Sequence, residues 1–109
     1  MEEQSEELKL GGNIVLSGFR DVGRDTMVIL KKMIGTYVKR FNEIGNNIQE
    51  VKMVLKVIHG EGDNDMHEIK AKVLDNGKVY TSEETERNLF VCVDDVLAKI
   101  ETNMLSNKQ

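Results

Sequence analysis

The 109-residue sequence has no tryptophan, only three Phe and two Tyr, and a single cysteine, Cys92. One cysteine cannot form an intramolecular disulfide, which excludes a disulfide-stabilised fold. No apolar run approaches the roughly 20 residues that a membrane-spanning helix needs, and the first residues are too acidic for a signal or transit peptide. We therefore expect one cytoplasmic domain with a modest aliphatic core and no membrane partner.

Sequence motifs for catalysis and cofactor binding are also missing. Ser17-Gly18 lacks the flanking glycine of a nucleophile elbow, and the chain has no phosphate loop or dinucleotide-binding glycine pattern. Cys92 lies between apolar neighbours with no cation nearby in sequence to lower its pKa, so a packing role is expected. We expect no catalytic residue, no cofactor and no small-molecule substrate, and interpret the chain as a protein that is not an enzyme.

Two histidines and three acidic residues gather near one loop, at His59, Asp63, Asp65, His67 and Glu68. Their spacing matches neither a zinc motif nor a calcium loop with its terminal bidentate Glu. We expect a polar hairpin loop there and no metal site.

Alternating and helical hydrophobic patterns predict an α+β fold with the order β-α-β-β-β-α. The strongest local signal is Asn76-Gly77, because both central residues of a type I′ hairpin turn need positive φ. Both helices are amphipathic, so they are expected to pack on one face of a small sheet. The expected elements are strands over 13–17, 51–58 and 69–73, a short strand after the turn, and helices over 26–42 and 89–104.

Each predicted helix has one apolar stripe. The stripes are Met27, Leu30, Ile34, Val38 and Phe41 in the first helix, and Leu89, Val93, Val96, Ile100 and Met104 in the second. Tyr37 borders the first stripe and is interpreted as structural, whereas Phe19 and Tyr80 are candidates for stacking on bases. Residues 1–12 are expected to form an acidic mobile tail, 13–105 the folded domain and 106–109 a short C-terminal tail.

The net charge of -4 is unevenly distributed along the chain. Residues 1–10 hold four Glu and one Lys, whereas residues 11–60 hold eight basic and four acidic residues. Many of the remaining acids are expected in loops, over 61–65 and 83–86. Between Thr26 and Asn42 there is no acidic residue, so the outer face of the first helix is basic. Because phosphate binding depends on the local field, an acidic net charge does not exclude RNA as a partner.

Four lysines, Lys52, Lys56, Lys70 and Lys72, are expected together on the exposed face of adjacent strands. Like charges placed there destabilise each other unless an anion binds. Two simpler interpretations stay open. The helix cations can serve solubility alone, and the strand lysines can serve only to prevent edge-to-edge aggregation of the sheet.

Several short motifs follow one another in a characteristic order. The first strand and its following glycine are Ile14-Val15-Leu16-Ser17-Gly18, the first helix ends on Lys39-Arg40-Phe41, and the last helix contains Leu89-Phe90, Val93-Asp94 and Lys99-Ile100. In order and spacing these motifs resemble those of the short ribosome hibernation-promoting factors, also called ribosome-associated inhibitors. The resemblance covers roughly residues 13–105.

The resemblance implies a fold like a double-stranded-RNA-binding domain that occupies the mRNA and tRNA channel of the small ribosomal subunit and silences idle ribosomes. We expect a monomer that binds rRNA phosphates without reading sequence. The alternatives are a non-ribosomal RNA-binding module, and a homodimeric protein-interaction domain with no nucleic acid partner. The expected phosphate contacts are Arg20, Arg24, Lys31, Lys32, Lys39, Arg40, Lys52, Lys56, Lys70, Lys72 and Lys99.

Overall fold

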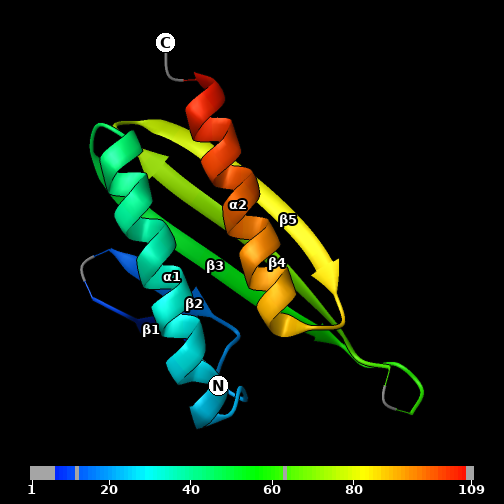
Figure 1. Cartoon of the computed structure of the whole chain (residues 1–109). Helices are drawn as coiled ribbons and strands as arrows, with labels where there is room; N and C mark the ends of the chain where they lie inside the picture. The colour runs from blue at the N-terminus through cyan, green and yellow to red at the C-terminus, as the bar shows by residue number, and fades with distance from the viewer. Residues whose placement is uncertain (1–6, 12, 63, 108–109) are drawn as a thin grey trace.

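One mixed sheet of five strands is covered on one face by two helices (Figure 1). The computed structural model describes residues 7–11, 13–62 and 64–107. Helix α1 (Arg24–Ile44) connects β2 to β3, and helix α2 (Leu89–Asn107) follows β5. The strands lie in the order β1 (Leu8–Lys9), β2 (Ile14–Ser17), β3 (Ile48–Ile58), β4 (Met66–Asp75) and β5 (Lys78–Glu86). The predicted α+β class and the order β-α-β-β-β-α are confirmed, with β1 as an additional short strand.

The chain enters the sheet earlier than the sequence predicted. β1 pairs antiparallel with β2, with Leu8 opposite Leu16 and Lys9 opposite Val15. Leu8 and Lys9 are thus part of the sheet, within the segment that the sequence assigned to a mobile tail; residues 1–6 and 12 lie outside the described residues. At the other end, α2 continues past residue 105 to Asn107.

The β4–β5 hairpin has the predicted turn and a longer second strand. Asn76 and Gly77 have φ values of 52° and 87°, as a type I′ turn requires. β5 continues to Glu86, which pairs with His67 of β4, so the prediction of a loop over 83–86 is wrong. β5 is an edge strand that buries little surface, so its Ser, Thr and Glu residues show no hydrophobic alternation. Backbone pairing with β4 holds β5 in the sheet.

The two predicted apolar stripes form the core between the helices and the sheet. All five stripe residues of α1 are buried, as are Val93, Val96, Ile100 and Met104 of α2, while Leu89 is half-buried. Val91 lies off the stripe and is 43% exposed. The predicted rotation of both helices is therefore confirmed. In the part of the chain that the structure describes, neither helix has an apolar stretch long enough to cross a membrane.

The connection from β2 to α1 is fixed by a close approach to β3. Gly18 has a φ of 84°, and a Cβ atom at this position would collide with the carbonyl oxygen of Leu55, so the site requires glycine. The next residue, Phe19, is only 1% exposed. Phe19 is therefore a core residue, and the prediction that it stacks on bases is wrong.

Candidate nucleic-acid interface

Three lysines lie on the outer side of α1. Lys31, Lys32 and Lys39 are exposed, and within the described residues none of them forms an ion pair. Lys31 and Lys39 are about two helical turns apart, with the exposed Gly35 between them. A glycine there leaves space, so that a phosphate backbone can approach the helix closely between the two cations.

Strand β1 adds a fourth cation to this surface. Lys9 and Lys31 line the same hollow of about 290 Å³, together with Gly35. Lys9 was not among the predicted contacts, because it lies in the segment interpreted as a tail. The alternation Leu8-Lys9-Leu10 was the one available signal, and three residues are too few for a strand prediction. We call Lys9, Lys31, Lys32 and Lys39 the α1 basic face.

Two predicted contact residues, Arg20 and Arg24, precede these lysines. Arg24 is the first residue of α1, Arg20 lies in the connection before it, and both are exposed. Each is followed by an exposed aspartate, Asp21 or Asp25. The paired opposite charges weaken the local positive field, so these arginines can contribute less than the lysines of the α1 basic face.

Arg40 is held between the helices instead of facing outward. Its Nε and Nη2 atoms donate hydrogen bonds of 2.8 and 2.9 Å to the carboxylate of Glu101 in α2. The hydrogen bonds from Arg40 hold the pKa of Glu101 below its usual range. The guanidinium also lies 4.5 Å from the centre of the Tyr37 ring. Arg40 therefore joins α1 to α2, which removes it from the set of unpaired cations.

Tyr37 has the structural role that the sequence predicted. Its side chain is buried, and its hydroxyl donates a 2.6 Å hydrogen bond to Oδ1 of Asp94 in α2. Burial, followed by this hydrogen bond, raises the pKa of Tyr37 to about 12. The phenol thus stays protonated at neutral pH and fixes the contact between the two helices.

The strand lysines lie, as predicted, on the sheet face opposite the helices, where carboxylates lie between them. The pairing of β3 with β4 and of β4 with β5 shows which residue lies opposite each lysine. Lys72 Nζ lies 3.1 Å from the carboxylate of Glu50. Glu83 is the cross-strand partner of Lys70, and Glu68 that of Lys56. Lys52 and Lys72 lie opposite each other in the pairing of β3 with β4. The like-charged pair that the sequence predicted is thus present at Lys52 and Lys72, whereas Lys56 and Lys70 each face a glutamate.

Lys99 is also paired with an acid. Its amine contacts the carboxylate of Glu84, and this hydrogen bond raises the pKa of Lys99. Glu84, Glu86 and Asp95 have carboxylate oxygens that all lie within 4.8 Å of one another. This edge of the molecule, between β5 and α2, is therefore acidic, and Lys99 partly neutralises it.

His59, Asp65 and His67 line one hollow beside the β3–β4 loop, whereas Cys92 belongs to the core. His59 Nδ1 lies 3.3 Å from Asp65 at the exposed end of the β3–β4 hairpin, and His67 lies within β4; Asp63 is outside the described residues. Cys92 is buried, as predicted, and its thiol donates to the carbonyl oxygens of His67 and Glu84. Burial raises the pKa of Cys92 to about 11, so the thiolate is scarce at neutral pH.

No family model matches the chain, and a search of the curated proteins found no match. The case for a nucleic-acid interface therefore rests on where the cations lie. Of the eleven predicted contact residues, the structure brings Lys31, Lys32 and Lys39 together on α1, where none of them forms an ion pair with a described residue, although Glu43 follows Lys39 by one helical turn. It places Arg40, Lys72 and Lys99 in ion pairs with Glu101, Glu50 and Glu84.

Proposed function

We propose that this chain is a cytoplasmic ribosome hibernation factor that binds the small ribosomal subunit through rRNA phosphates. In this proposal it lies in the channel for mRNA and tRNA, and so blocks translation by idle ribosomes. The observation that supports the proposal best is the α1 basic face, where four exposed lysines lie without an ion pair among the described residues. The resemblance of the motifs in β2, α1 and α2 to the hibernation-promoting factors gives the proposed partner.

The side chains of the α1 basic face suit contacts with a phosphate backbone better than contacts with base edges. Lysines are flexible point charges that neutralise phosphates without selecting a base. Val28 and Ile29 of α1 are about half exposed, at 51% and 50%, and their aliphatic side chains have no hydrogen-bonding group that could read a base edge. Phe19 is buried and so cannot stack on bases. The α1 basic face therefore offers affinity for structured RNA and no base-specific readout.

Sedimentation of the full chain through sucrose gradients with small subunits, large subunits or whole ribosomes tests the proposal. We expect co-migration with small subunits and whole ribosomes, which weakens as salt rises, because each phosphate contact releases counterions. An in vitro translation assay should show inhibition at the same protein concentrations. Co-migration only with large subunits, or with none, would exclude the proposed partner; binding to free structured RNA alone would then indicate a non-ribosomal RNA-binding module.

A further inference from the structure

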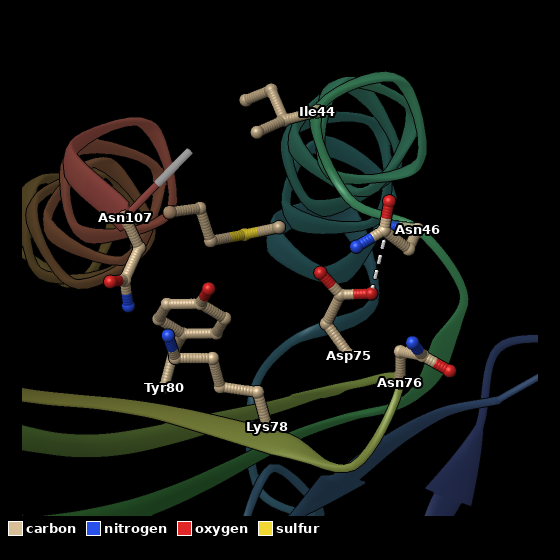
Figure 2. Close-up of a pocket in the computed structure, with 8 residues that line it drawn as sticks. Ile44, Asn46, Asp75, Asn76, Lys78, Tyr80 and Asn107 are labelled. Atoms are coloured by element: carbon tan, nitrogen blue, oxygen red, sulfur yellow. Dashed lines mark hydrogen bonds between the residues drawn. The ribbon is translucent and has the colours of Figure 1, made fainter. Parts of the chain in front are cut away.

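A polar hollow lies between the β4–β5 turn and the C-terminal ends of the two helices (Figure 2). Its volume is about 260 Å³, which is several times the roughly 30 Å³ that one water molecule occupies. Asp75 and Met104 form buried walls, whereas Asn46, Lys78 and Asn107 at the rim are exposed. The hollow is thus open to solvent and large enough for a small organic group.

The most unusual group in the hollow is the carboxylate of Asp75, which is only 6% exposed. Its Oδ1 atom accepts hydrogen bonds from the backbone N–H groups of Asn46 and Asn47, at 3.0 and 2.8 Å. Its other oxygen, Oδ2, has no hydrogen-bond partner among the described residues and points into the hollow (Figure 2). A buried carboxylate oxygen without a partner is costly, which makes Oδ2 a strong acceptor for a ligand.

Two residues of β5 complete the chemistry of the hollow. The Tyr80 hydroxyl points toward the same space as Asp75 Oδ2 (Figure 2). Lys78 lies opposite Asp75 in the strand pairing, yet its amine lies over the Tyr80 ring, 5.9 Å from the centroid, and forms no ion pair with Asp75. Among the described residues, the carboxylate of Asp75 therefore has no charged partner.

We propose that this hollow binds a small organic cation, an alkylammonium or guanidinium group, whose N–H donors reach Asp75 Oδ2. A buried negative charge excludes anions, and Tyr80 and Met104 provide an aromatic and a polarizable wall for the alkyl part. A divalent metal is disfavoured because one carboxylate with neutral amides gives too few charged oxygen ligands. This proposal goes beyond ribosome binding and does not depend on it.

Agmatine is a suitable probe, because it carries a guanidinium at one end and an ammonium at the other. Calorimetric titration of the full chain should give a Kd of about 1 mM or tighter, and NMR should show shifts of the Asn46 and Asn47 amide signals. These two amides donate to Asp75, so they report on its carboxylate and not on acids elsewhere on the surface. Methylguanidinium and methylammonium, titrated separately, identify which end binds, with KCl at matched ionic strength as the control.

Two substitutions separate a binding role for Asp75 from a structural one. Asp75→Asn keeps an Oδ1 acceptor for the two backbone amides but replaces the Oδ2 acceptor by an NH₂ donor, so agmatine binding should weaken about tenfold or more. Lys78→Met removes a competing cation that lines the hollow and should tighten binding about threefold. Thermal unfolding of each variant shows that it is folded.

Unchanged agmatine affinity in folded Asp75→Asn would overturn the proposal, as would the absence of Asn46 and Asn47 shifts at about 10 mM agmatine. If Asp75→Asn does not fold, Lys78→Met decides the question. Tighter binding in Lys78→Met supports a cation site at Asp75, and unchanged or weaker binding overturns it.

Discussion

Helix α1 and the open face of the sheet each expose several lysines, and they differ in the carboxylates that lie beside those lysines. On α1, no acidic residue occurs between Thr26 and Asn42. On the sheet, Glu50, Glu68 and Glu83 lie next to Lys72, Lys56 and Lys70. The comparison teaches that a count of lysines does not identify an anion-binding surface. What matters is whether the fold brings carboxylates within a few ångströms of them.

The largest expected effect is that of charge reversal on α1. Replacing Lys31, Lys32 and Lys39 by Glu leaves the buried stripe intact, so the domain should fold. Each lost phosphate contact should lower the slope of log affinity against log salt by roughly 0.7 to 0.9. The triple variant should therefore leave the small-subunit fraction at near-physiological salt and should no longer inhibit translation in vitro.

The matched control reverses three sheet lysines, Lys52, Lys70 and Lys72, to Glu, which changes the net charge by the same amount. If the α1 basic face is the contact surface, this control should retain most of its ribosome binding. Equal loss in both triple variants would show that binding responds to bulk charge, and loss in the sheet variant alone would make the open sheet face the interface.

A smaller effect is expected when the carboxylates beside the sheet lysines are removed. Substituting Glu50, Glu68 and Glu83 by Gln removes the carboxylates and leaves the lysines unpaired. The open face should then gain affinity for structured RNA, with a salt slope steeper by about 1 to 3 if one to three lysines find phosphates. Filter binding to a double-stranded RNA at several salt concentrations measures this. An unchanged slope would mean that the carboxylates are not what keeps RNA away from the sheet.

Most of the fold could be predicted from the sequence, because the relevant signals are local. The stripes of α1 and α2 follow helical spacing, and Asn76-Gly77 specifies its own turn. The full length of β5 was missed because an edge strand of Ser, Thr and Glu lacks hydrophobic alternation. β1 was missed because it is held by pairing with β2, and the alternation Leu8-Lys9-Leu10 is too short to predict a strand.

The candidate site could be predicted only in part. That Lys31, Lys32 and Lys39 are exposed follows from the position of the α1 stripe. Register decides the rest: once the turn is placed at Asn76-Gly77, Glu83 lies opposite Lys70, but only if β5 is known to extend that far. The pairing of Arg40 with Glu101 joins residues 61 positions apart and depends on how the helices pack, which no local pattern specifies.

A third prediction concerns Arg40, which lies beside the α1 basic face but belongs to the helix contact. Because Arg40 holds the pKa of Glu101 below its usual range, the folded state binds that proton less readily than the unfolded state does. The ion pair therefore contributes stability above about pH 4.3 and loses it as pH falls through the lower folded-state pKa. Glu101→Gln should lower the melting temperature by a few degrees at pH 7 and flatten its decline in acid.

The control for Arg40 is Glu43→Gln, an exposed carboxylate of the same helix that forms no ion pair with another described residue. The dependence of its melting temperature on pH should match that of the parent protein.

Glu101→Gln also releases Arg40 from its ion pair, so the salt slope for RNA binding should steepen by at most roughly 0.9. Parallel acid profiles for Glu101→Gln and the parent would show that the ion pair does not contribute to stability in solution.

The smallest expected effect is that of Lys9, which tests whether β1 extends the α1 basic face. Lys9→Gln removes one charge, and strand pairing uses only the backbone of this residue, so the melting temperature should stay nearly unchanged. If Lys9 and Lys31 bind neighbouring phosphates across their shared hollow, the salt slope should fall by roughly 0.7 to 0.9 and the affinity by a few-fold. Sedimentation with small subunits at three salt concentrations measures both. Lys78→Gln replaces an exposed lysine at the far edge of the sheet and should change neither the salt slope nor the affinity. An equal change in the two variants would show that Lys9 acts only through net charge, which would restrict the interface to α1.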